Sequence, residues 1–167
     1  MNSMQQSTAR AWMLKNDKNP SCIMKPFLTL ALSFFTLTAM AQNPVLGKWK
    51  TIDDETGRIK SVVEITEREG KLYGQVIELF RLPEEDQNPI CDECEDDRKD
   101  QPALGMEIVR DMVPVAGELE WEDGTICDPK NGKVYDCEMW LEEDNMDELK
   151  VRGYILFLFR TQTWLRQ

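Results

Sequence analysis

The sequence predicts an all-β fold, an antiparallel up-and-down β-barrel of about eight strands, with an open β-sandwich as the alternative. Apolar and polar residues alternate with period two through short segments rich in β-branched and aromatic side chains. Tight-turn residues separate most of these segments. No stretch combines a helical apolar stripe with caps, so little helix is expected.

Five strands are expected in the chain before residue 128. The second and third of them form a β-hairpin, because Glu69 and Gly70 stand between two alternating segments as a tight turn. In chain order the five segments are residues 46–52, 62–66, 72–79, 105–113 and 118–127.

A tight turn at residues 128–133 precedes the last three strands. Pro129 presets φ early in this turn, and Gly132 supplies a left-handed exit. Residues 149–155 and 160–166 form the last two strands. The strand before them, residues 133–141, alternates and carries one apolar face: Tyr135, Cys137, Met139 and Leu141.

One long segment, residues 81–102, should be irregular because its three prolines and many acids disfavour a regular element. We expect it to cap or flank one end of the barrel. Its acids, between residues 84 and 100, lack the alternating oxygen ligands and central glycine of a calcium loop. We therefore expect a solvated loop, and likewise expect residues 142–144 to be a solvated turn rather than part of a glycosidase acid/base pair.

Residues 24–41 form a predicted export signal. Residues 24–41 have a positive start, an apolar centre of about 12 residues and an Ala-Met-Ala ending, and this centre is shorter than a membrane span. We expect cleavage before Gln42, residues 1–23 to be an unstructured upstream extension, and residues 42–167 to form one domain. A retained anchor helix is the alternative. The expected location is periplasmic or secreted, with no integral membrane segment after cleavage.

Composition excludes several classes of function. The chain has no histidine, which excludes Ser-His-Asp and Cys-His nucleophile pairs and histidine-bound metal or haem. Residues 42–167 contain 16 basic and 30 acidic side chains, a net charge of −14. Such a surface disfavours nucleic acid as a partner. We expect no enzymatic activity and no cofactor, and nothing in the sequence indicates an oligomeric state.

A Gly-x-Trp motif opens the first strand, at Gly47 and Trp49, and Arg160 and Arg166 lie in the last. This arrangement resembles the lipocalin-like (calycin) barrels. The resemblance implies that an arginine from the last strand packs over the Trp49 indole at the closed end of the barrel. A planar guanidinium can stack on an indole while its donors reach nearby carbonyl groups, so the implied role is structural.

Residues 45–166 also resemble a family of secreted bacterial proteins known as domain of unknown function 2147. Two features depart from the family: Cys127 is an extra thiol, and the turn between Tyr154 and Arg160 lacks a glycine. The resemblance implies a small exported β domain and brings no catalytic residues. It rests on residues 47–49 and 53–57, 70–74, 91–94 with Pro102 and Gly105, 128–129 and 132–137, 149–154, and 160–164.

The cysteines allow several interpretations. Cys91 and Cys94 are expected to form a local disulfide in an oxidising compartment. A redox pair is an alternative, although the neighbouring acids would raise the thiol pKa values. A zinc site shared with Cys127 and Cys137 is another. Those two should not pair with each other, because a turn at residues 129–132 leaves them roughly 10 Å apart.

Ligand binding is the leading expectation for function. The interior of an eight-stranded barrel can hold a small apolar or amphipathic ligand. Alternatively, the aromatics fill the core, or the protein is a cell-envelope interaction module or an enzyme acting on envelope material. The expected inward-facing lining of the pocket is Tyr73, Trp121, Trp140 and Tyr154.

Six apolar residues in a row, residues 154–159, stand where the last hairpin must turn. Alternation would direct only half of them inward. We therefore expect Phe157 and Phe159 to form an apolar rim at the mouth of the barrel, where a ligand enters or a partner docks. The alternative is a long strand whose outer face is covered by residues 81–102.

Overall fold

A computed structural model describes residues 43–167 as a closed antiparallel barrel. This confirms the predicted fold class and excludes the open sandwich. The predicted upstream extension and signal peptide lie outside the described residues. In chain order the strands are β1 (Gly47–Ile52), β2 (Ile59–Arg68), β3 (Lys71–Leu79), β4 (Glu107–Pro114), β5 (Glu120–Asp128), β6 (Lys133–Glu142), β7 (Asn145–Ile155) and β8 (Leu158–Arg166).

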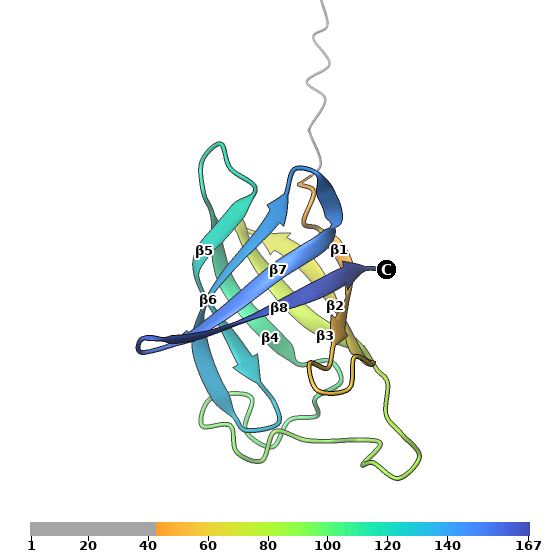
Figure 1. Ribbon diagram of the computed structural model, residues 1–167. Coiled ribbons are helices and arrows are strands. Elements are labelled where there is room, and N and C mark those ends of the chain that lie inside the picture. The colour runs from red at the N-terminus through yellow and green to blue at the C-terminus, as the bar shows by residue number, and fades with distance from the viewer. Residues whose placement is uncertain (1–42) are drawn as a thin grey trace, which may run out of the picture. The chain divides into compact units, whose positions relative to one another are not determined.

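Each strand pairs with the next along the chain, and β1 pairs with β8 to close the sheet (Figure 1). The closing register aligns Trp49 with Arg166 and Lys50 with Leu165. Tight turns at residues 69–70, 129–132 and 156–157 join strands that alternate between inward and outward side chains. The described residues contain no helix that is long and apolar enough to cross a membrane.

Large side chains fill the interior of the barrel. Glycine makes room for them at Gly74, where an added Cβ would lie 3.0 Å from Cβ of Val109. The largest fully buried side chains belong to every strand except β5: Trp49, Trp164, Ile65, Leu72, Met112, Met139, Leu149, Val62, Val63 and Val109, with Val45 and Cys91 from outside the strands. Trp121 of β5 is buried with them.

Two irregularities interrupt the alternation in β4 and β5. Asp111 and Asp123 both adopt positive φ, at 60° and 58°, which is typical of a residue inserted at a bulge. Trp121 and Gly124 are buried on either side of the exposed residues 122 and 123. Gly124 is required here, because a Cβ would lie 2.6 Å from the carbonyl oxygen of Arg110.

The long segment between β3 and β4 passes across the lower end of the barrel (Figure 1). Cys91 and Cys94 in this loop are buried and form the predicted disulfide. Backbone hydrogen bonds hold the loop against itself, from Cys91 N to Gln101 O at 2.9 Å and from Asp100 N to Cys91 O at 2.9 Å. The loop therefore caps this end, as its position in the sequence predicts.

An ion pair between buried Arg98 and partly exposed Asp96 stabilises the same loop. The Arg98 guanidinium is almost fully buried, pairs with Asp96 and donates to the carbonyl oxygen of Glu107 at 3.3 Å. The hydrogen bond from Arg98 lowers the pKa of Asp96 to about 2.

The register of β5 and β6 sets Cys127 opposite Val134 rather than opposite Cys137. Cys127 and Cys137 are both free and buried, and they do not pair with each other, as the sequence predicts.

Candidate binding surface

The Trp49 indole closes the barrel end opposite the long loop. Its Nε1 donates to the carbonyl oxygen of Val45 at 2.8 Å, and the Arg166 guanidinium lies 4.2 Å from the ring centroid. Arg166 also donates to the carbonyl oxygens of Pro44 and Met146, at 2.9 and 2.7 Å. This guanidinium therefore stacks on the indole and satisfies two backbone acceptors together.

Arg160, the other arginine named from the sequence, has a different position. It pairs with Asp54 in the turn between β1 and β2, and Gln162 donates to the same carboxylate at 3.3 Å. The reason is distance along β8, because Arg160 lies six residues before Arg166 and near the opposite end of the strand. Gly47 begins β1 with φ of 117°, a conformation that favours glycine.

The predicted pocket lining is wrong for three of its four residues. Trp121 faces the interior, but Tyr73, Trp140 and Tyr154 lie half-buried on the outer face of the sheet. Alternation explains this for Trp140, since its neighbours Met139 and Leu141 are both buried. Tyr73 likewise stands between buried Leu72 and Gly74, and Tyr154 is aligned with exposed Asp136.

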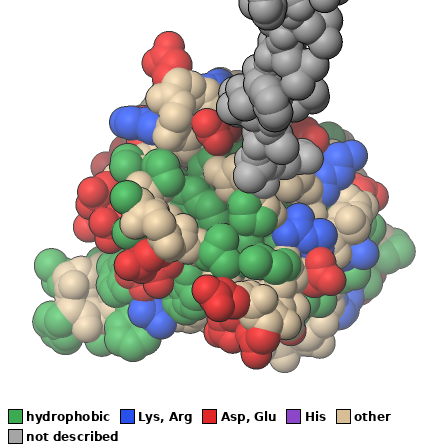
Figure 2. Space-filling model, turned by 90° about the horizontal axis from the view of Figure 1, so that it is seen from above, with side chains coloured by type: hydrophobic (Ala, Val, Ile, Leu, Met, Phe, Trp, Pro, Cys, Tyr) green, Lys and Arg blue, Asp and Glu red, His purple; other side chains and the backbone are tan. Residues whose placement is uncertain are grey.

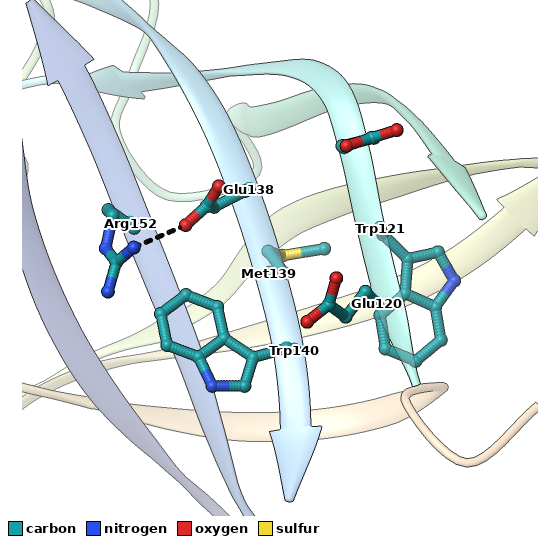
Figure 3. A pocket seen from close by; sticks show the side chains of 7 residues that line it. Glu120, Trp121, Glu138, Met139, Trp140 and Arg152 are labelled. Carbon is teal, nitrogen blue, oxygen red and sulfur yellow. Dashed lines mark hydrogen bonds and ion pairs between the residues drawn. The ribbon is translucent and has the colours of Figure 1, made fainter. Parts of the chain in front are cut away.

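Trp140 lines a shallow outer depression of about 130 Å³ over β5, β6 and β7. Figure 3 shows Arg152 and Glu138 beside it, and these two side chains form an ion pair at 2.7 Å. The Arg152 guanidinium also lies 4.6 Å from the Trp140 ring. The protein's own Arg152 thus occupies the position that a bound cation would take over this indole.

Burial and the neighbouring carboxylates Glu118, Glu138 and Glu122 raise the pKa of Glu120, which lines the same depression.

Tyr73 lines a smaller outer depression, of about 70 Å³, over β2, β3 and β4. The Arg68 guanidinium lies 3.7 Å from its ring centroid, and its hydroxyl donates to Asp111 at 2.9 Å. The hydrogen bond to Asp111 raises the pKa of Tyr73. The hydroxyl and the ring face of Tyr73 are therefore already in contact with the protein's own side chains, as the Trp140 ring is with Arg152.

Among residues 43–167 the most exposed apolar surface is the end of the β7–β8 hairpin, residues 155–159, which we term the apolar tip. Leu156 and Phe157 form the turn and expose 92% and 86% of their surface. Leu158 and Phe159 expose 60% and 64%, so residues 81–102 do not cover this segment. The hairpin extends to one side of the barrel in Figure 1, and apolar side chains project at that side in Figure 2.

The apolar tip is also strained. Leu156 has φ of 54°, a left-handed conformation that costs a branched residue about 1–2 kcal/mol and that two-residue hairpin turns normally assign to glycine or asparagine. This is where the sequence lacks the expected glycine. A strained backbone that keeps a large apolar side chain in solvent is typical of a functional site rather than of a structural turn.

Replacing Leu156 by glycine should stabilise the isolated protein by about 1 kcal/mol, because glycine adopts positive φ without a steric penalty. Leu156→Ala is the control, since it removes the side chain and retains the strained Cβ, and it should stay within about 0.5 kcal/mol of the wild type. Urea unfolding of both variants measures the difference. A destabilised Leu156→Gly variant would show that the leucine side chain contributes to folding.

Comparison with known proteins places the barrel in a family. Residues 47–166 match a family described as an uncharacterized protein conserved in bacteria, domain of unknown function 2147. The match covers all eight strands of the barrel, from the start of β1 to the end of β8. The chain belongs to this family. No curated protein matches the chain.

A solved structure has the same fold as this family member. Protein HP1028 from the human pathogen Helicobacter pylori, which belongs to the lipocalin family, is similar with a TM-score of 0.59. The two chains are 18% identical over 73% of this chain and 82% of that one. The closed eight-stranded barrel is therefore lipocalin-like, as the Gly-x-Trp motif predicts.

Proposed function

We propose that this family member is an exported binding protein of the bacterial envelope that docks on a partner protein through the apolar tip. The observation that carries this proposal is the exposure of Leu156 and Phe157 at the end of a strained hairpin. Contiguous exposed apolar surface usually marks an interaction site. The tip is convex, so it suits insertion into a pocket on another molecule.

The packing of the barrel argues against the carrier function that a lipocalin-like fold suggests. Small-ligand sites are concave, and carriers of this fold hold their ligand inside the barrel. Here Trp49, Trp121 and Trp164 are buried in that space, among aliphatic and methionine side chains. The two depressions described above lie on the outer face, and the arginine in each is already paired, Arg152 with Glu138 and Arg68 with Glu107.

Charge favours a protein partner over a lipid surface. Residues 42–167 carry a net charge of −14, which repels anionic head groups. Membrane-inserting tips are usually supported by free basic residues, but Arg152 pairs with Glu138 and Arg160 pairs with Asp54. The partner should therefore present an apolar pocket bordered by lysine or arginine, and the complex should weaken as salt increases.

The test is site-specific photo-crosslinking in the bacterium that encodes the protein. A photoreactive phenylalanine analogue at Phe157 should crosslink to one protein, while the same analogue at Leu104, another exposed apolar residue, should not. The crosslinked protein is then purified, and its affinity is measured for the wild type, Phe157→Asp/Phe159→Asp and Leu104→Asp.

The double variant should bind at least about tenfold more weakly, because a buried unpaired carboxylate costs more than about 1.4 kcal/mol. Leu104→Asp should bind like the wild type. Binding of the wild type, but not the double variant, to zwitterionic phospholipid vesicles would instead assign the tip to a membrane. Unfolding of the double variant would show that the segment belongs to the core.

A further inference from the structure

Three cysteine sulfurs gather at the capped end of the barrel, far from the apolar tip in sequence. Cys91 and Cys94 belong to the long loop, and Cys127 belongs to β5. Their sulfur atoms all lie within 4.8 Å of one another, and all three side chains are buried. The Sγ atoms of Cys94 and Cys127 are 3.7 Å apart.

Backbone packing independent of the disulfide brings the loop to Cys127. The turn after β5 contacts the loop at Gly132, where an added Cβ would lie 2.1 Å from the carbonyl carbon of Glu93. Gly132 adopts φ of 65°, so this turn combines a left-handed residue with a close backbone contact. The Arg98 hydrogen bond to Glu107 O anchors the other side of the loop.

The distance between the Cys94 and Cys127 sulfurs matches that between two thiolates on one metal ion. Two thiolates bound tetrahedrally to zinc at about 2.3 Å lie roughly 3.8 Å apart. The distance between Cys94 and Cys127 already has this value, at 3.7 Å. Reduction of the Cys91–Cys94 bond would give two thiols beside the free thiol of Cys127, so that three sulfur ligands are available in a buried cluster.

We propose that the reduced protein binds one soft d10 cation, of the Zn²⁺ or Cu⁺ class, through Cys91, Cys94 and Cys127. In the oxidised protein the Cys91–Cys94 disulfide prevents binding. A dithiol reductant supplies two electrons and two protons, which convert the disulfide to two thiols while the reductant becomes a disulfide. Metal binding then releases the thiol protons to solvent as the three sulfurs coordinate.

Cys137 provides a matched control, because it is also a free buried cysteine. It lies on β6, contacts the carbonyl oxygen of Glu138 at 3.7 Å, and is not part of the three-sulfur cluster. The zinc site with all four cysteines, considered from the sequence, is therefore replaced by a site with three. A fourth position on the metal stays open for a small ligand.

The test uses the full chain with Cys22→Ser, so that only the four cysteines of the described region remain. The protein is reduced with dithiothreitol, freed of reductant under argon and titrated with Zn²⁺ against a chromogenic chelator. One Zn²⁺ should bind per reduced chain. The oxidised chain and Cys127→Ser should each bind about a hundredfold more weakly or worse, and Cys137→Ser should bind like the parent.

Equal affinity of the reduced and oxidised chains would overturn the proposal, as would equal losses in Cys127→Ser and Cys137→Ser. Circular dichroism checks that the variants are folded. A second measurement needs no variant at the site: alkylation followed by peptide mass spectrometry, with and without Zn²⁺. Bound Zn²⁺ should protect Cys91, Cys94 and Cys127 together, and protection of any other set contradicts the assignment.

Discussion

Replacement of Trp49 by alanine should lower the free energy of unfolding by about 3–5 kcal/mol, the range for removing a fully buried tryptophan. Trp49 has no exposed surface, and it joins three parts of the chain. Its indole donates to Val45 O, packs in the core and supports the Arg166 guanidinium. Truncation leaves a cavity, an unpaired carbonyl and an arginine without its stacking partner.

Trp140→Ala is the matched control and should cost only about 1 kcal/mol. The same side chain is removed, but from the outer face, where it is half-buried and contacts Arg152. Urea unfolding of both variants provides the comparison. Similar losses would contradict the assignment of Trp49 to the interior and Trp140 to the outer face.

Replacement of Gly132 by alanine should cost about 3 kcal/mol. Its positive φ contributes about 1–2 kcal/mol of strain for any residue with a Cβ. The added Cβ would also meet backbone atoms of Glu93 and Cys94, at 2.1 and 2.5 Å, and backbone gives way less readily than a side chain. The loop and the β5–β6 turn would have to separate.

Gly117→Ala isolates the conformational part of this loss. Gly117 also has positive φ, at 84°, but a Cβ there would contact nothing within 4 Å. It should therefore cost about 1–2 kcal/mol and leave the loop in place. Thermal or urea unfolding measures both variants, and amide hydrogen exchange of residues 91–101 reports the loop. An equal effect of the two substitutions would contradict the close contact between Gly132 and Glu93.

The strands could be predicted from the sequence because period-two alternation and turn residues are local signals. All eight expected segments overlap the observed strands, and the irregular loop lies where its prolines place it. The bulges at Asp111 and Asp123 could not be predicted in this way, since a single inserted residue reads as a short break in alternation. Closure depends on the pairing of β1 with β8, which the strand count only suggested.

The candidate site was predicted less well, for a physical reason. Tyr73, Trp140 and Tyr154 were chosen as pocket residues by side-chain type, whereas the alternation of Met139, Trp140 and Leu141 indicates an outward tryptophan. The contact of Arg152 with Glu138 depends on the register between β6 and β7, which no local pattern encodes. The apolar tip could be recognised because a run of six apolar residues exceeds what one face can bury.

Native mass spectrometry of the protein, purified without detergent from its own bacterium, tests most directly whether binding takes place outside a filled barrel. The account predicts the mass of the polypeptide without a small molecule, before and after organic extraction. An interior ligand would have to displace core side chains and would be expected to accept hydrogen bonds from Trp121 Nε1 or Trp164 Nε1, buried donors without a partner among the described residues. A single apolar molecule recovered at near-stoichiometric yield would contradict the account and restore the carrier function.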